Sequence, residues 1–92
     1  MYDKYDYTIK SIANKRSDGK INRYHEQILG AKCTPGMMEI GYKGGLLIET
    51  FNMEDTPWRH WYYTSLVESI EANDDDELVI ETLNSTYVLS KI

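Results

Sequence analysis

The sequence has a single cysteine, Cys33, and no apolar run long enough to cross a bilayer as a helix, which would take about 18 residues. A lone cysteine excludes an intramolecular disulfide and a multi-cysteine zinc site. We expect Cys33 to be a small buried thiol, because unpaired cysteines usually pack as small hydrophobic residues. The opening residues, Met1 to Asp6, are polar and acidic, unlike a secretory signal. Together these features predict a cytoplasmic protein with no membrane segment.

Length is the next limit on what the chain can do. Its 92 residues are too few for two cores, which predicts a single domain over residues 1–92. A domain of this size buries about 60–65% of the surface that its unfolded chain exposes, so a large internal active-site cavity is not expected. Function should therefore lie on a surface, in a shallow groove or at an interface between subunits of a homo-oligomer.

An excess of positive charge is also absent. The net charge is −5 and is unevenly spread: residues 1–32 carry seven Lys or Arg against four Asp or Glu, and residues 44–92 carry two against ten. Neutralisation of phosphates by basic side chains drives nucleic-acid binding, so direct DNA or RNA binding is disfavoured. The acidic half suits a basic groove on a protein partner, or it simply keeps the protein in solution.

Signatures of catalysis and of cofactor binding are missing as well. The chain has no nucleophile elbow, P-loop or dinucleotide fingerprint. His25 and His60 lie far apart without a Cys, His or carboxylate at metal-binding spacing, so we expect each to be half-exposed with its polar tip in water, a shared zinc site being the alternative. The acidic segment 68–81 lacks the spacing of a calcium loop. The sequence predicts a non-enzymatic protein with no cofactor and no metal.

Aromatic and β-branched residues are abundant by contrast. Eight Tyr, two Trp and one Phe accompany many Ile, Val and Thr, a composition that favours strands. Apolar residues alternate from Tyr5 to Ile9, and Ile12 falls out of phase, which predicts a strand with a bulge near Lys10 or Ser11. Residues 14–22 are polar and contain Asp18-Gly19, a pair typical of turns.

The middle of the chain is harder to assign. Residues 23–30 fit a short helix or a strand, and we favour a strand because Gly30 and Pro35-Gly36 close the segment soon after. Two apolar runs, 37–42 and 46–51, flank Gly44 and Gly45. Paired glycines between apolar runs predict a hairpin turn, because glycine adopts positive φ without steric cost.

The last third of the chain predicts a three-stranded meander. An aromatic stretch begins at Trp58, and Asn73–Asp76 reads as an exposed turn, since four polar residues could not be buried without partners. Residues 78–83 alternate, Asn84-Ser85 reads as a tight turn with Asn84 tolerating left-handed geometry, and a final strand follows. The whole chain therefore predicts an all-β or β-dominated α+β fold, a small antiparallel barrel or meander of SH3-like size.

The aromatic stretch 58–63 holds more rings than one face of a strand can bury. Some must point outward, where they can stack on a base or anchor an interface, unless both faces of the sheet are covered. Pairing across the two turns would also bring hydroxyl and amide groups to one rim, either as a ligand pocket or as caps for the turn. The predicted ligand-binding set is Arg59, Trp61, Thr64, Ser65, Asn84 and Tyr87.

The acidic run gives a second candidate site. Carboxylates at alternate strand positions repeat at roughly 6.6–7 Å, about the spacing of successive phosphates, so the run can mimic a nucleic-acid backbone in a basic groove. A plain solvated turn is the alternative. The predicted protein-binding set is Glu71, Asp74, Asp75, Asp76 and Glu77.

Two further patterns carry a resemblance. Thr64-Ser65-x-Val67-x-x-Ile70, followed by Ile80-Glu81-Thr82-x-Asn84-Ser85-x-Tyr87-x-Leu89, resembles small uncharacterised β-barrel proteins of bacteriophages and mobile elements. The resemblance covers about the last third of the chain, with a partial match at 28–33. It implies an anti-defence role inside the host cell, such as blocking a defence enzyme or sequestering its nucleotide signal.

Two hypotheses follow from the residues and the resemblance. In the first, the chain is an inhibitor that binds a host protein through its acidic face. In the second, it sequesters a small nucleotide in a pocket formed by the ligand-binding set at the interface of a homo-oligomer.

Overall fold

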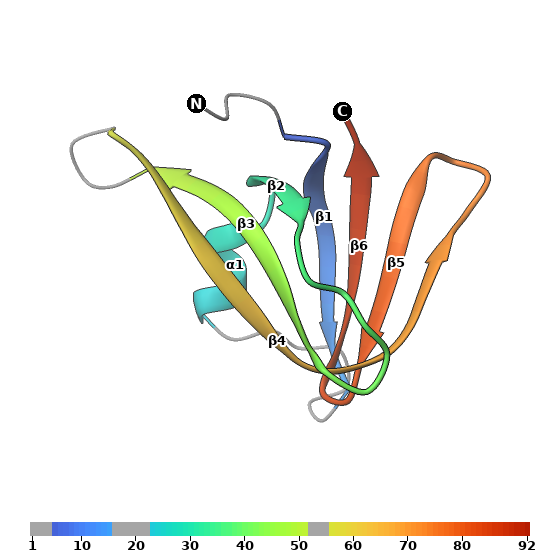
Figure 1. Ribbon diagram of the computed structural model, residues 1–92. Coiled ribbons are helices and arrows are strands. Elements are labelled where there is room, and N and C mark those ends of the chain that lie inside the picture. The colour runs from blue at the N-terminus through green and yellow to red at the C-terminus, as the bar shows by residue number, and fades with distance from the viewer. Residues whose placement is uncertain (1–4, 16–22, 52–55) are drawn as a thin grey trace.

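The computed structural model describes residues 5–15, 23–51 and 56–92. These residues form a small closed barrel of six antiparallel strands with one short helix, so the predicted β-barrel class is confirmed (Figure 1). Neighbours in the sheet follow chain order, and β6 pairs with β1 to close the barrel. The elements are β1 (Tyr7–Asn14), α1 (Arg23–Ile28), β2 (Lys32–Pro35), β3 (Lys43–Phe51), β4 (Pro57–Ala72), β5 (Glu77–Thr82) and β6 (Ser85–Lys91).

The C-terminal meander and the first strand match their predictions. Strands β4, β5 and β6 pair in sequence, with Ile80 opposite Ile70 on one side and opposite Tyr87 on the other. The pairing of β1 with β6 shifts by one residue between Ile9 and Ser11, which is the expected bulge. The bulge returns Ile12 to the inner face, so that Ile9 and Ile12 are both buried.

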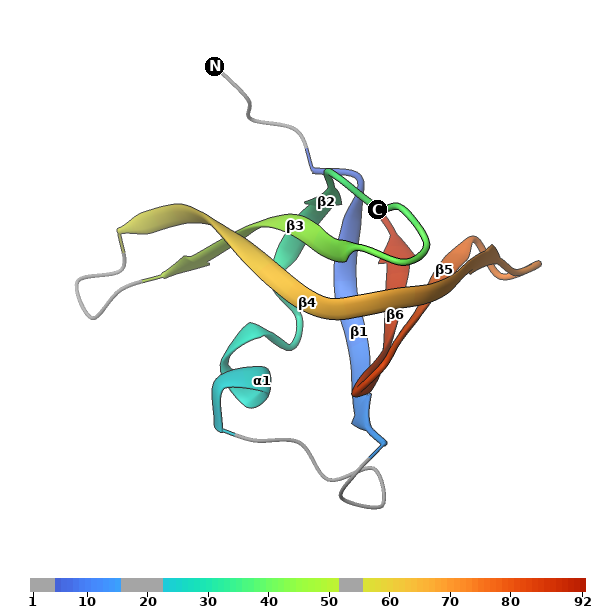
Figure 2. The same cartoon turned by 60° about the horizontal axis from the view of Figure 1, so that its bottom comes forward.

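Strand β4 is the longest element and belongs to two parts of the sheet. Its first half pairs with β3 from Pro57 to Leu66, and its second half pairs with β5 from Val67 to Ala72. A register shift between Val67 and Ser69 marks the place where β4 passes from one neighbour to the other. The strand sweeps across the molecule, and with β3 it forms a two-stranded arm that extends beyond the barrel (Figures 1 and 2).

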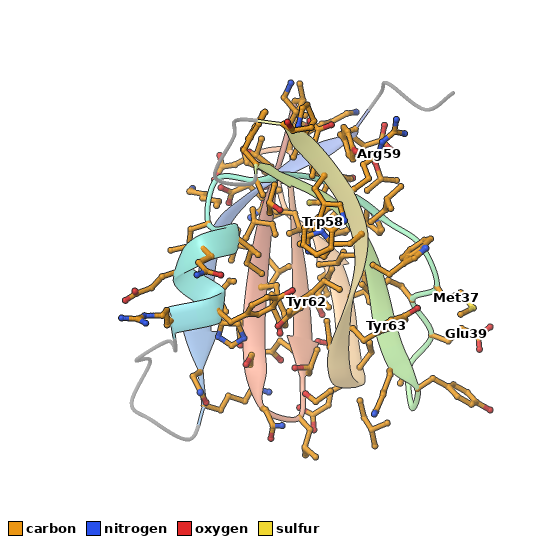
Figure 3. The ribbon with its side chains drawn as sticks, turned by 90° about the vertical axis from the view of Figure 1, so that its left-hand side faces the viewer. Met37, Glu39, Trp58, Arg59, Tyr62 and Tyr63 are labelled. Carbon is orange, nitrogen blue, oxygen red and sulfur yellow. The ribbon has the colours of Figure 1, made fainter. Side chains whose placement is uncertain are left out.

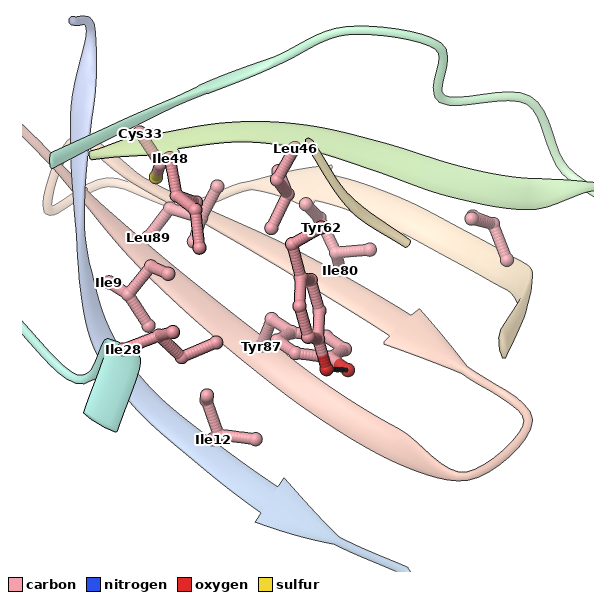
Figure 4. Packing of buried hydrophobic residues seen from close by; sticks show 11 residues of the cluster. Ile9, Ile12, Ile28, Cys33, Leu46, Ile48, Tyr62, Ile80, Tyr87 and Leu89 are labelled. Atoms are coloured by element: carbon pink, nitrogen blue, oxygen red, sulfur yellow. Dashed lines mark hydrogen bonds between the residues drawn. The ribbon is translucent and has the colours of Figure 1, made fainter. Parts of the chain in front are cut away.

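The core fills the barrel with side chains from every element (Figure 4). Aliphatic residues dominate, and Tyr62 and Tyr87 complete the core where the interior becomes polar. Burial of each large aliphatic side chain contributes about 1.5–3 kcal/mol to the free energy of unfolding. Because a domain of this size has only a small core, this cluster is its main source of stability. The buried cluster comprises Ile9, Ile12, Ile28, Cys33, Leu46, Ile48, Tyr62, Val67, Ile80, Tyr87 and Leu89.

Residues 23–30 form a helix and not the strand that we favoured. His25 and Ile28 are three positions apart, so a helical turn places both on the face that meets the barrel, where both are buried. Gly30 follows with φ of 81°, the left-handed conformation in which helices commonly end, and the Ala31 amide donates to the Ile28 carbonyl. Glycine 30 therefore ends a helix here.

The predicted hairpin at Gly44-Gly45 is also wrong. Both glycines lie inside β3, and residues 36–42 form the connection from β2. A Cβ on Gly44 would lie 2.6 Å from Met38 Sδ and 2.9 Å from Thr64 Oγ1, so Gly44 is required by close packing rather than by a turn. The left-handed conformation in this connection belongs to Gly41, at φ 93°.

The turns of the described residues can also be compared with their predictions. The turn at Asn73–Asp76 falls where predicted, whereas the next turn is Leu83-Asn84 and not Asn84-Ser85, because Ser85 already belongs to β6. The left-handed residue is Asp76, at φ 57°, and not Asn84. The turn predicted at Asp18-Gly19 lies outside the described residues. No helix in the described part of the chain is long and apolar enough to cross a membrane.

Candidate functional site

The arm of β3 and β4 has an inner face that no second sheet covers. The register pairs Ile48 with His60 and Thr50 with Trp58, so these side chains share the face that continues from the barrel interior. Beyond the buried Ile48, this face looks toward α1 and the segment that leads into β2 (Figure 2). The arm therefore forms one wall of an open groove.

This groove has a volume of about 690 Å³ and lies between the arm and the chain from α1 to β2. Aromatic and aliphatic side chains supply most of its wall, and among the described lining residues only Lys32 and Glu49 are Lys, Arg, Asp or Glu. The lining residues are Tyr24, Gln27, Ile28, Leu29, Gly30, Ala31, Lys32, Glu49, Thr50, Phe51, Trp58 and His60.

Large apolar side chains around the groove are exposed to solvent. Trp58 is 57% exposed and Phe51 64%, and Tyr24 and Leu29 on the opposite wall are each at least 40% exposed. Trp58 stacks on His60 with ring centroids 4.0 Å apart and planes 21° from parallel, which makes a flat platform on the arm. Contiguous exposed apolar surface of this kind marks binding sites on small proteins.

The strand that carries this platform has an open edge. From Pro57 to Tyr63, β4 pairs with β3, and none of the described strands pairs with its other edge. Unpaired strand edges present rows of backbone N–H and C=O groups that can accept a further strand. The platform of Trp58 and His60 therefore sits on a strand segment that is open for pairing.

Arg59 and Trp61, predicted as ligand-binding residues, lie on the opposite face of β4. They alternate with the inward-facing Trp58, His60 and Tyr62, and Figure 3 shows Arg59 and Tyr63 on the side of the strand away from α1. Trp61 packs over Gly36 and Gly45 on that outer face. The structure therefore does not bring all six predicted ligand residues together.

Three of the six do meet in a separate small pocket of about 250 Å³ at the end of the barrel. Ser65, Asn84 and Tyr87 converge there, as the predicted pairing across the turns required. We call this site the polar pocket. It is lined by Asn14, His25, Tyr62, Ser65, Asn84, Ser85 and Tyr87.

The inner wall of the polar pocket is a buried hydrogen-bonded chain that the sequence did not reveal. His25 Nε2 lies 3.0 Å from Tyr62 Oη. The Tyr62 and Tyr87 hydroxyl oxygens lie 2.8 Å apart (Figure 4). Burial lowers the pKa of His25, and burial raises the pKa of both tyrosines, so all three groups are held neutral. The expectation of a half-exposed His25 is wrong, because α1 turns this side chain into the barrel.

Thr64 and Ser65 hold the barrel end together. Thr64 Oγ1 accepts from the Gly44 amide and donates to the Ser65 carbonyl. Ser65 Oγ donates to Thr82 Oγ1 and accepts from the Asn84 amide, at 2.9 and 3.1 Å. These contacts satisfy backbone groups of the strand and the turn. This turn-capping role was the predicted alternative to a ligand pocket.

The acidic residues gather at the far end of the β4–β5 hairpin. Glu71, Asp74, Asp75 and Asp76 are exposed, whereas Glu77 is half-buried and forms an ion pair with Lys10. The turn is ordered by Asn73, whose Oδ1 accepts from the backbone amides of Asp75 and Glu77. The hairpin thus displays its carboxylates on a fixed turn, at the opposite end of β4 from the groove (Figure 1).

No group of three or more His, Cys, Asp or Glu within the described ranges is placed to hold a metal ion. Cys33 is buried and free, as expected. Comparisons of the chain with protein-family models, with curated proteins and with solved structures give no match.

Proposed function

We propose that this chain is a non-enzymatic binding protein that captures an extended segment of a partner protein in the groove beside α1. The observation that carries the proposal is the exposed Trp58–His60 platform on a strand segment whose second edge pairs with none of the described strands. An extended peptide can pair with such an edge through its backbone and place alternate side chains against the platform.

The chemistry of the groove favours a peptide over a nucleotide. A nucleotide needs cationic or N–H donor groups for its phosphates beside the ring that stacks its base. Arg59, the cation predicted for that role, lies on the outer face of β4, and Lys32 in the groove wall is register partner to Glu49. Apolar side chains and unpaired backbone groups match the needs of a peptide strand instead.

The acidic hairpin tip supports a second candidate function, the binding of a basic protein surface. Its carboxylates are exposed, and Asn73 fixes the turn that carries Asp74 and Asp75. An anti-defence role in a phage, which the resemblance implies, is compatible with either mode of protein binding and stays a prediction.

Selection from a display library of random linear peptides tests the main proposal. Enriched peptides should carry apolar residues at alternate positions, because successive side chains of an added strand face opposite sides. Trp58→Ala should weaken binding of such a peptide about tenfold or more, as loss of an aromatic anchor does at interface centres. Methylation of the peptide's backbone nitrogens at alternate positions should abolish binding in one register only.

Trp61→Ala is the matched control, because Trp61 is 50% exposed on the same strand but on the opposite face. This variant should retain peptide affinity. Asp74→Lys with Asp75→Lys should also retain it. Equal losses from Trp58→Ala and Trp61→Ala would exclude the groove, and loss caused by the charge reversal alone would favour the acidic tip.

A further inference from the structure

The polar pocket lies on the other side of α1 from the groove. Tyr24 lines the groove and stacks on the Tyr62 ring at 5.5 Å, whereas the next residue, His25, lines the polar pocket. The two sites thus share the helix but have no residue of α1 in common. Binding of a ligand in the polar pocket is therefore independent of the proposed peptide binding in the groove.

The walls of the polar pocket are built and not merely exposed surface. His25, Tyr62, Ser85 and Tyr87 line it and are each less than a tenth exposed. In the part of the lining that the structure describes there is no aliphatic side chain and no Asp, Glu, Lys or Arg. The nearby ammonium group of Lys15 is engaged elsewhere, with Glu68 at 2.9 Å and the Thr82 carbonyl at 2.7 Å.

Asn84 presents an acceptor that the described residues leave unused. Its Oδ1 is buried without a hydrogen-bond donor, although its backbone amide donates to Ser65 Oγ and its carbonyl accepts from the Lys15 amide. A buried acceptor with no donor is destabilising, because its lost hydration is not replaced. The backbone of Asn84 therefore stabilises the fold through its two hydrogen bonds. Its side-chain oxygen is destabilising unless a ligand in the pocket donates a hydrogen bond to it.

We propose that the polar pocket binds a small neutral molecule rich in hydroxyl groups, of the size of a single sugar ring. A volume of about 250 Å³ has room for about eight water molecules at ~30 Å³ each. Among the described lining residues there is no Asp, Glu, Lys or Arg, so a phosphate, carboxylate or ammonium ion would be desolvated against them without a counter-charge. Hydroxyl groups both donate and accept, which suits a wall made of amide, phenol and serine groups.

Ligand hydroxyls would meet complementary partners in this lining. Asn84 Oδ1 accepts from one hydroxyl, and the polar side chains of Asn14, Ser65 and Ser85 lie in the same lining. The His25 and Tyr87 rings are buried against each other and leave little apolar surface in the lining, so recognition would rest on a few placed polar groups.

Titration followed by ¹H–¹⁵N NMR tests this assignment, with D-ribose and myo-inositol as neutral probes and with phosphate and ammonium salts as charged probes. At least one neutral probe should shift the backbone amides of Asn84 and Ser85 saturably, while the Trp58 indole signal in the groove stays unchanged. The charged probes should produce no saturable shift at these amides.

Asn84→Ala should abolish the saturable shift and leave stability to urea unchanged or raised, because both backbone hydrogen bonds remain and the unsatisfied acceptor is removed. Leu83→Ala is the control, since Leu83 lies in the same turn with its side chain exposed. It should keep the response. Absence of saturable shifts with both polyols would mean that the pocket holds water only and would overturn the proposal, as would equal shifts in Asn84→Ala or a response to phosphate alone.

Discussion

The hydroxyl oxygens of Tyr62 and Tyr87 lie 2.8 Å apart inside the barrel. Their strands, β4 and β6, are separated in the sheet by β5, so this hydrogen bond joins two walls that the strand ladder does not connect directly. The rings meet edge to face, with centroids 6.0 Å apart. His25 extends the same chain to α1. A single tyrosine hydroxyl, that of Tyr62, therefore links the helix to the far side of the barrel.

Tyr62→Phe should lower the free energy of unfolding by about 1–3 kcal/mol. The substitution removes the central hydroxyl of the chain and leaves two buried polar groups, on His25 and Tyr87, without this partner. Equilibrium urea unfolding measures the change. Tyr63→Phe is the matched control, because Tyr63 is 61% exposed on the outer face and its loss of a hydroxyl should cost less than about 0.5 kcal/mol. Equal effects would show that the buried chain adds no stability.

Stability should fall as the pH is lowered from about 8 to about 5, with a contribution from His25. Burial lowers the pKa of His25 below its ordinary 6.5, so in this range the unfolded chain binds more protons than the folded protein. His25 therefore contributes fully to stability only above the pKa that it has in the unfolded chain. As the pH falls below that pKa, the unfolded chain takes up protons and unfolding is favoured.

Urea unfolding at several pH values measures this slope. His25→Gln should reduce the slope of the unfolding free energy against pH. His60→Gln, which alters the half-buried ring on the arm, should leave this slope unchanged. A slope that His25→Gln does not change would place the acid sensitivity in other groups. Glu77 loses its stabilising contact with Lys10 only at more acidic pH, because hydrogen bonds from Lys10 and Asn73 lower its pKa below 4.5.

Adjacent glycines in β3 should respond differently to substitution by alanine. A Cβ at Gly44 would meet Met38 Sδ at 2.6 Å and Thr64 Oγ1 at 2.9 Å, whereas the nearest atom to a Cβ at Gly45 is 3.6 Å away. Neither residue has positive φ, so the comparison isolates packing. Gly44→Ala should cost about 1–3 kcal/mol, and Gly45→Ala should be near neutral. The same thermal denaturation assay on both variants decides the matter, and similar midpoints would contradict the close packing of Gly44.

Period-two alternation of apolar residues predicted the C-terminal strands correctly. Ile80 and Thr82 in one strand, and Tyr87 and Leu89 in the next, could be assigned to the interior because period-two patterns persist through each strand. The helix could not be found in this way, because in six residues only His25 and Ile28 face inward. Residues 37–42 were predicted as a strand, but they form a loop in which Met37, Ile40 and Tyr42 are exposed and only Met38 packs against the core.

The same alternation also determines which of the predicted site residues share a face. Arg59 and Trp61 have the same parity along β4 and must share a face, which is opposite to that of Thr64. Parity alone could therefore have divided the predicted ligand set. The groove was out of reach, because Trp58 meets the wall carrying Tyr24 only once α1 and the arm are placed in space.

Cys33 should be inert in the folded protein and reactive once the barrel opens. Its side chain is fully buried, and burial, with a smaller contribution from the charge of Asp6, raises the pKa of its thiol to about 12. Because the thiolate is the reactive species, native protein at neutral pH should react with a disulfide reagent such as DTNB only through opening of the fold. The reaction rate should then rise with urea in step with unfolding and should be faster in Gly44→Ala than in Gly45→Ala. A fast reaction of the wild-type protein without urea, equal in both variants, would mean that Cys33 is accessible without unfolding and that β2 opens independently of the core.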